Sequence, residues 1–335
     1  MMMNFETFKG VVETELINFL PDSMKNGKVV FEKVPKVNRE LDAVTVVIEG
    51  ENENICPTLY LQDMYERYEQ TENLPEVMSE FAAAYLQSME KREEVIQKLD
   101  LPNCKDRIIF QLINAEQNKG LLADVPYRPF QDLAIIYRVV VEEKEGILAS
   151  SIITNKVADA IGMKEAELFE LAAENTKRIN PVKVIGMSEM LRGTLFDMGA
   201  DEEDIDLMMP YHPDEEVMFV ITNERNTNGA ISMIYEDELH ELSELIRDDL
   251  YILPSSIHEV LAVAASSQTP EMLADMVYTI NMAQVNLEDR LSNQVYHYDR
   301  NARTLTLATD TPNKRLDGEV AEQQLVYEAN KGPKR

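Results

Sequence analysis

The sequence has few of the residues that usually carry metal or redox chemistry. Its 335 residues include only two cysteines, Cys56 and Cys104, and four histidines. The cysteines form no CxxC pair and no cluster with histidine, so the sequence predicts neither a zinc site nor a disulfide framework. We therefore expect no metal and no cofactor, and we interpret both cysteines as reduced core thiols of a cytosolic protein.

Long apolar runs and basic residues are also scarce. No stretch approaches the roughly 18–20 apolar residues that a membrane-spanning helix needs. The first residues, MMMNFETFKG, lack the pattern of a secretory signal. Acidic residues outnumber basic ones by 61 to 32, which gives a formal net charge of −29. Because such a chain repels phosphate groups, we expect that it binds neither nucleic acid nor membrane directly. The missing signal and spanning run lead us to expect a cytoplasmic protein.

The common catalytic motifs are missing as well. The chain contains no G-x-G-x-x-G, no phosphate-binding G-x-x-x-x-G-K-[ST], no H-E-x-x-H and no kinase signature. No catalytic residue is assigned on this basis.

What the sequence does contain is an alternation of helical and strand-like segments, with 44% hydrophobic residues to build a core. Apolar spacing predicts helices over 4–20, 74–99, 150–161, 164–178, 187–198, around 239–246 and from 270 onward. Strands are predicted over 29–34, 43–48, 58–61, 107–113, 133–141 and 182–185. Two hairpins are expected, 217–221 with 230–234 and 295–298 with 304–308. The predicted class is α+β, with mixed, largely antiparallel sheets and packed helices.

The charged, glycine-ended break Glu142–Gly146 indicates a domain boundary. We expect an N-terminal α+β domain over 1–145 and a C-terminal α+β domain over 146–308, although one large domain would also fit the length. The pattern stops after 308, so 309–335 is predicted to be a disordered tail.

The element Ser255–Glu259 combines hydroxyls, an imidazole and a carboxylate. In an extended strand Ser256 and His258 would share a face, whereas Glu259 would point the opposite way. No G-x-S-x-G surrounds either serine, so nucleophilic catalysis is disfavoured. Two interpretations stay open, a structural turn and a binding site for a small ligand or a partner.

A second candidate pair, Arg128 and Asp132, lies directly before the apolar segment 133–141. These side chains either contribute to the same binding site or anchor a loop through a salt bridge.

The third candidate is an acidic stretch, 193–224, which contains no lysine or arginine. The order of an EF-hand loop is absent, so calcium binding is not predicted. The stretch is either a solvated loop or a docking surface for a basic protein partner. The carboxylates assigned to such a surface are Asp201, Glu202, Glu203, Asp204, Asp206, Asp214 and Glu215.

Residues 155–173 resemble a helix-turn-helix, but the second predicted helix is acidic. Glu165, Glu167, Glu170 and Glu174 would fall where DNA contacts are made, so we interpret both helices as structural.

Four segments carry a resemblance: VPYRPFQDLAIIYRVVV, SSIITNKVADAIGMKEAELFELAAENT, TNGAISMIYEDEL and YILPSSIHEVLAV. Together they resemble an uncharacterised bacterial family, domain of unknown function 5688. The resemblance implies a bacterial, non-secreted accessory protein and brings no activity or functional residues with it.

Our leading hypothesis is therefore a non-enzymatic cytoplasmic protein that binds a basic macromolecular partner through its acidic surface, in a sharper version as a mimic of DNA. The alternative is a small-molecule-binding protein or enzyme with a pocket near Ser255–Glu259.

Overall fold

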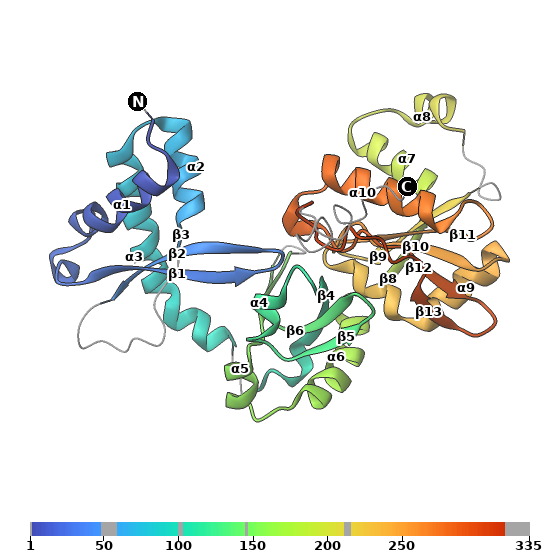
Figure 1. The fold of residues 1–335 in the computed structure, drawn as a ribbon, viewed down its shortest axis with the longest axis horizontal. Coiled ribbons are helices and arrows are strands. Elements are labelled where there is room, and N and C mark those ends of the chain that lie inside the picture. The colour runs from blue at the N-terminus through green and yellow to red at the C-terminus, as the bar shows by residue number, and fades with distance from the viewer. Residues whose placement is uncertain (1, 48–58, 100–102, 145–146, 211–215, 319–335) are drawn as a thin grey trace, which may run out of the picture. The chain divides into compact units, whose positions relative to one another are not determined.

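The computed structural model describes residues 2–47, 59–99, 103–144, 147–210 and 216–318, without the side chains of 91–99, 144 and 147. The chain divides into two compact units, Met1–Asp100 and Leu101–Arg335 (Figure 1). Strand pairings within both units are antiparallel and helices pack against the sheets, so the predicted α+β class is confirmed.

In the described part of the first unit, three α-helices pack against a small sheet with the order β1-β2-β3. Its elements are α1 (Phe5–Glu15), η1 (Leu16–Phe19), η2 (Asp22–Met24), β1 (Lys28–Lys36), β2 (Arg39–Val47), β3 (Leu59–Tyr60), α2 (Leu61–Thr71) and α3 (Leu74–Leu99).

The local sequence explains how this unit closes. Asn4 caps α1 by accepting a hydrogen bond from the Thr7 N–H at 2.9 Å. Phe8, one helical turn further, is fully buried and stacks on Tyr68 of α2. Tyr85 of α3 fixes the sheet to the helices, because its hydroxyl bonds both the N–H and the C=O of Val46.

The second unit contains two sheets. In the four-stranded sheet β6 pairs with β4, β5 and β7. Its elements are η4 (Lys105–Arg107), β4 (Ile108–Asn114), α4 (Lys119–Leu122), β5 (Tyr127–Phe130), β6 (Leu133–Lys144), β7 (Ile147–Ile152), α5 (Asn155–Ala160) and α6 (Glu165–Ile179).

The six-stranded sheet has the order β13-β12-β10-β11-β9-β8, which leaves β8 at one edge. Helices α7 and α10 lie on one side of it and α9 on the other (Figure 1). The elements are β8 (Val182–Gly186), α7 (Met187–Asp197), α8 (Glu202–Met208), β9 (Met218–Asn223), η6 (Gly229–Ile234), α9 (Glu236–Ile246), β10 (Leu250–Leu253), β11 (Val260–Ala264), α10 (Pro270–Gln284), η7 (Leu287–Asp289), β12 (Tyr296–Asp299) and β13 (Thr304–Leu307).

The predicted boundary near 145/146 does not coincide with the division between the compact units. It falls between β6 and β7, which pair antiparallel from Arg138 with Ile152 to Lys144 with Ile147. A charged, glycine-ended segment marks a hairpin connection as readily as a linker, and here the two strands on either side of it belong to one sheet.

The predicted hairpin around Asn228-Gly229 is wrong. Residues 229–234 form the 3₁₀ helix η6, and β9 pairs with β8 and β11 instead. Gly229 is required here for a close approach, since a Cβ on it would lie 2.6 Å from the backbone oxygen of His258.

The predicted tail begins too early. Leu316 is fully buried, and the Asn293 side chain donates to the backbone oxygens of Asn313 and Arg315 at 3.0 and 3.2 Å. Residues 309–318 thus pack on the second unit, and 319–335 lie outside the described residues.

The helix-turn-helix-like pair is embedded in the fold. Thr176 of α6 accepts a hydrogen bond from the Phe110 N–H of β4, and Phe169 packs on the Phe110 ring with centroids 5.1 Å apart. One face of α6 is therefore occupied by the four-stranded sheet.

Candidate functional site

Ser255–Glu259 forms the connection between β10 and β11 rather than an extended strand entry. The expected alternation of side-chain faces therefore does not apply. The loop is fixed by its backbone: Ser255 accepts from the Leu291 N–H at 3.1 Å, and Ile257 donates to the Asp289 oxygen at 2.8 Å. These bonds hold the element as a turn against the segment 289–291.

Both ring nitrogens of His258 have partners. The Asn228 N–H donates to Nδ1 at 3.2 Å, and Nε2 lies 3.2 Å from Oδ1 of Asp289. Because Nδ1 accepts, the neutral ring carries its proton on Nε2 and donates it to Asp289. The Ser256 hydroxyl accepts from the His258 backbone N–H at 3.0 Å. The turn thus contains a serine and a histidine, but the contacts do not form a nucleophile–base pair.

Glu259 differs from the other residues of the turn, because it lines a groove that it shares with residues of α7, β8 and β9. Burial raises the pKa of its carboxyl, an effect that the nearby His258 and a hydrogen bond from Ser256 oppose. Of the residues proposed for the Ser255–Glu259 site, it alone lies in the lining of this groove.

Arg128 and Asp132 do not join the turn in one site. Arg128 forms a bidentate pair with Glu165 at 3.0 and 3.2 Å, and its guanidinium stacks 3.5 Å from the centre of the Phe169 ring. These contacts anchor β5 to α6. A loop-anchoring salt bridge was one of the two interpretations, with Glu165 as the partner that the sequence did not identify.

Asp132 connects the two sheets of the second unit. Its carboxylate accepts hydrogen bonds from the Ser292 hydroxyl at 2.6 Å and from the Tyr296 hydroxyl. Burial raises the pKa of this carboxyl, and the two hydroxyls oppose that effect. Asp132 thus links the residue before β6 to Ser292 and to β12 from a half-buried position.

The acidic stretch contains a helix that the sequence analysis did not predict. Asp201 caps α8 by accepting from the Asp204 N–H at 2.8 Å, and Asp206 pairs with Arg192 of α7. Glu202, Glu203 and Asp204 remain exposed in the first turn, where carboxylates are favoured by the helix dipole. Asp214 and Glu215 lie outside the described residues.

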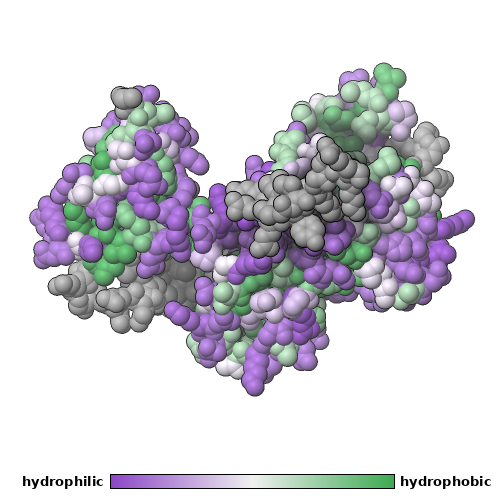
Figure 2. Space-filling view, viewed as in Figure 1, coloured by the Kyte–Doolittle hydropathy of each residue, from purple (hydrophilic) through white to green (hydrophobic). Residues whose placement is uncertain are grey.

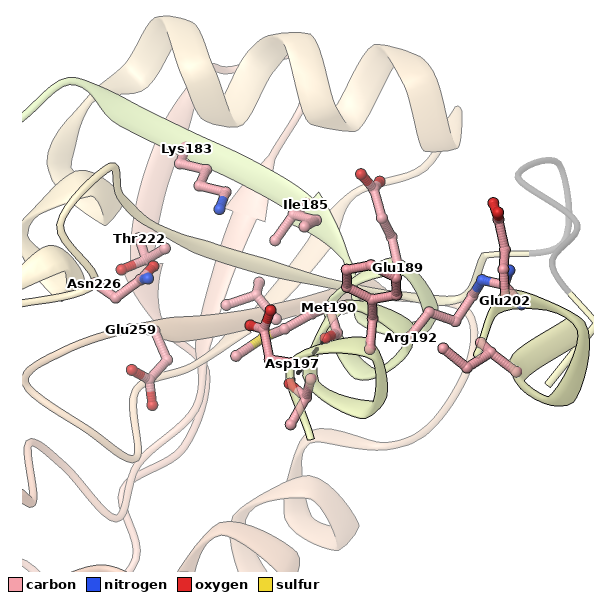
Figure 3. Close-up of a pocket in the computed structure, with 15 residues that line it drawn as sticks. Lys183, Ile185, Glu189, Met190, Arg192, Asp197, Glu202, Thr222, Asn226 and Glu259 are labelled. Carbon is pink, nitrogen blue, oxygen red and sulfur yellow. Dashed lines mark hydrogen bonds between the residues drawn. The ribbon is translucent and has the colours of Figure 1, made fainter. Parts of the chain in front are cut away.

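Helices α7 and α8 enclose a groove of about 690 Å³ against β8 and β9, which we call the α7 groove (Figure 3). Lys183, Thr222, Asn226 and Glu259 lie at one end and Glu202 at the other (Figure 3). Apolar side chains line the part between these ends: Ile185, Met190, Phe196, Ile205 and Val220. The groove thus has an apolar middle part, and its polar lining combines carboxylates with Lys183 and Arg192.

The helix α7 has no buried residue, although it is rich in apolar side chains. Phe196 is 63% exposed, Met198 79% and Leu207 of α8 83%. Apolar surface gathers over α7 and α8 (Figure 2). A contiguous exposed apolar surface of this kind is typical of an interaction site.

A second groove of about 720 Å³ lies on the opposite face of the β8 edge, against α9, and we call it the α9 groove. Its apolar lining comes from Val184, Ile185, Phe219, Leu242, Leu245 and Ile246, and its carboxylates are Glu189, Glu216, Glu238 and Glu241. Glu216 is partly engaged, because it accepts the Ser188 N–H at the start of α7 at 2.9 Å.

Most of these residues carry no clear signal in the sequence. Apolar spacing predicts the helix 187–198, but an apolar residue that stays exposed has the same signature as a core residue. Only the position of Met190 beside the acidic stretch and of Phe196 within it sets these two residues apart. Lys183, Glu238 and Glu241 carried no signal in the sequence.

Among the described residues, no group of three or more histidine, cysteine, aspartate and glutamate side chains is arranged to hold a metal ion. Within the same part of the chain, no helix combines the length and apolar character needed to cross a membrane.

The fold and the two grooves define an α+β protein with an acid-rimmed, apolar-lined surface on its second unit. The chain belongs to DUF5688, a family of unknown function, whose model matches residues 5–300, so the predicted family is confirmed. No curated protein and no solved structure matches the chain.

Proposed function

We propose that this protein is a non-enzymatic accessory protein whose α7–α8 surface binds a basic, apolar-anchored segment of a protein partner. The observation that carries the proposal is α7, a helix without a buried residue whose apolar side chains lie among exposed carboxylates. Burying such side chains against a partner is favourable by roughly 25 cal/mol per Å² of apolar surface. The carboxylates would select a basic partner and speed its encounter.

The same surface favours a peptide-like partner over the groove of a DNA-binding protein. A DNA mimic needs carboxylates at the spacing of phosphates and little apolar surface between them. Here Asp201 is a helix cap and Asp206 is paired with Arg192, so two of the predicted acidic side chains have structural partners. Exposed Leu207 and Met208 follow directly.

The proposal includes a cytoplasmic, bacterial setting. It is supported by the low cysteine content, which is typical of proteins kept in a reducing compartment, and by what the family resemblance implies.

The test is affinity capture from cells that produce the protein, at low and at physiological salt, with partners identified by mass spectrometry. Binding is then measured with the purified partner. We expect Phe196→Asp to weaken it about tenfold or more, because an exposed aromatic in an apolar groove is a typical anchor. We expect the double variant Glu202→Gln/Glu203→Gln to weaken it less and to reduce its salt dependence.

The matched control is Glu170→Gln/Glu174→Gln, which removes the same charge from exposed positions of α6. This control should leave binding unchanged. An affinity unaffected by Phe196→Asp would contradict the proposal. If the partner is a nucleic-acid-binding protein that duplex DNA displaces, the DNA-mimic version is correct instead.

A second candidate is a small molecule bound at the polar end of the α7 groove. The observation that favours it is Lys183, which forms no ion pair with the described residues, near Thr222, Asn226 and Glu259. A ligand that raises the melting temperature of the wild-type protein but not of Lys183→Met would support this function.

A further inference from the structure

The edge strand β8 separates the two grooves. It pairs with β9 on one side, and no other strand among the described residues pairs with its outer side. Lys183 and Ile185 line the α7 groove (Figure 3), and Val184 and Gly186 line the α9 groove, which Ile185 also contacts at its border. The edge is thus flanked by hollows of similar size on both faces.

The pairing shows which backbone groups of β8 point outward. The Glu224 N–H donates to the Pro181 oxygen at 3.0 Å. Pro181 and Glu224 continue the register of β8 and β9, since the adjacent pair is Val182 with Asn223. Hydrogen-bonded positions alternate along an antiparallel pair, so Lys183 and Ile185 bond to β9. The N–H and C=O groups of Val182 and Val184 and the N–H of Gly186 therefore point away from β9, whereas the C=O of Gly186, the N-cap of α7, belongs to the first turn of that helix.

Native edge strands are often protected by short length, by lysine, by proline, by a bulge or by a covering element. The five-residue segment Val182–Gly186 contains no proline, its register with β9 is continuous, and its one lysine, Lys183, lines the α7 groove. Val184, at its centre, is 40% exposed. An outer edge of this kind can accept another strand through main-chain hydrogen bonds.

The charges of the grooves differ, and this determines which side chains an added strand would carry. Among the described residues, the lining of the α9 groove has four carboxylates, of which Glu238 pairs with Lys177, and no lysine or arginine. The α7 groove contains Lys183 and Arg192 beside its own carboxylates, with Ile185, Met190 and Phe196 between them. Cationic side chains therefore fit the α9 groove, where Leu242 and Leu245 can contact their aliphatic stems. Apolar side chains fit the α7 groove.

We propose that the partner segment binds as an added β-strand along β8, with apolar side chains entering the α7 groove and lysine or arginine side chains entering the α9 groove in alternation. The inference rests on the proposed function, because it specifies how the same surface holds the same partner. It commits to an extended protein segment with alternating apolar and basic residues.

The test uses the full-length protein and a synthetic seven-residue peptide in which valine or leucine alternates with lysine. A peptide of the same composition with its apolar and basic residues in separate blocks is the first control. Two N-methylated versions of the alternating peptide form a matched pair, since each blocks the N–H groups on one edge of the extended peptide. We expect the alternating peptide to bind and the block peptide to bind about tenfold more weakly or worse.

We expect one N-methylated peptide to lose about tenfold or more in affinity and the other to bind like the parent, because only one edge faces β8. Amide exchange at Val182, Val184 and Gly186 should slow on binding. Val184→Pro removes one outward N–H and should weaken binding to a similar degree, and its melting curve reports whether it stays folded. The N-methylated peptides test the same bond with the protein unchanged.

Two failures are distinguishable. If Phe196→Asp weakens binding of the peptide or the captured partner, but the N-methylated pair binds equally and the three amides exchange as before, the added strand is wrong and the proposed function stands. If Phe196→Asp has no effect on either ligand, the proposed function fails together with the inference.

Discussion

Nε2 of His258 lies 3.2 Å from Oδ1 of Asp289, which fixes one side of the imidazole, while the Asn228 N–H bonds the other side. His258 therefore connects three segments that are distant in sequence. This arrangement supports the structural interpretation of the Ser255–Glu259 turn over a catalytic one.

We predict that His258→Ala destabilises the protein by about 1–3 kcal/mol, because it leaves the Asn228 N–H and the Asp289 carboxylate without their partner. His258→Asn should cost less, since its side-chain oxygen can accept from the Asn228 N–H in place of Nδ1. Urea unfolding of both variants measures the difference. Partner binding should persist in the folded fraction. An unchanged unfolding curve for His258→Ala together with lost binding would make the turn a functional site.

Asp132 should make the stability depend on pH. Burial raises the pKa of its carboxyl in the folded state, so the folded protein binds this proton more tightly than the unfolded chain. From about pH 4, the ordinary value for aspartate, up to the raised folded value, the folded state carries more protons. The contribution of Asp132 to stability therefore falls as the pH rises through this window.

We predict that Asp132→Asn, which cannot ionise, gains stability relative to the wild-type protein as the pH rises through the window. Its amide can still bond the hydroxyls of Ser292 and Tyr296. Urea unfolding from pH 4 to 8 measures the trend. Asp299→Asn is the control, since backbone N–H groups, first that of Ala302, lower the pKa of Asp299. Its contribution to stability therefore changes only below about pH 4, and the difference between wild type and Asp299→Asn should stay constant from pH 4 to 8. A constant difference between wild type and Asp132→Asn across this range would show that Asp132 does not titrate differently on folding.

The segment 309–318 is predicted to be needed for stability, contrary to the expectation from the sequence. Truncation after Ala308 removes Leu316, which is fully buried, and the Thr309 hydroxyl that accepts the Val295 N–H at 2.9 Å. Loss of one buried leucine side chain alone costs about 2–5 kcal/mol. Truncation after Gly318 is the matched control. The shorter protein should melt several degrees below the control. Equal melting temperatures would restore the original expectation.

The sequence predicted elements where periodicity and local signals agree. The helix that begins at Pro270, with Thr269 as its cap, and the hairpin of β12 and β13 are both present in the structure. Short elements are not predictable in this way. The residues of α8 are recognised from the sequence only as part of the acidic stretch, and β5, which spans only Tyr127–Phe130, is too short to show a periodicity. The Asn228-Gly229 pair wrongly predicts a hairpin, because a local turn signal does not show which strands will pair with β9.

The candidate site depended still more on tertiary structure. Carboxylates were identifiable in the sequence, but their roles as a cap or as the partner of Arg192 require the neighbouring helix. The exposure of Phe196 and the edge position of β8 follow from how the sheet is ordered, which periodicity does not encode.

The close approach of Gly229 to the turn yields a last prediction. A Cβ at this position would lie 2.3 Å from the Thr222 hydroxyl oxygen, 2.6 Å from the His258 carbonyl oxygen and 2.8 Å from the Asn223 nitrogen. Two of these atoms are backbone, so the contact cannot be relieved by rotating a side chain. Gly229→Ala must therefore separate η6 from β9 and from the Ser255–Glu259 turn.

We expect Gly229→Ala to destabilise the protein by about 1–3 kcal/mol or more, the range for overpacking a closely packed position. Gly120→Ala is the matched control, because a Cβ on Gly120 in α4 would meet no atom within 4 Å. This control should gain up to about 1 kcal/mol, since alanine restricts the unfolded chain. Chemical denaturation measures both variants. If Gly229→Ala unfolds like the wild-type protein, η6 does not approach the turn as closely as the structure shows.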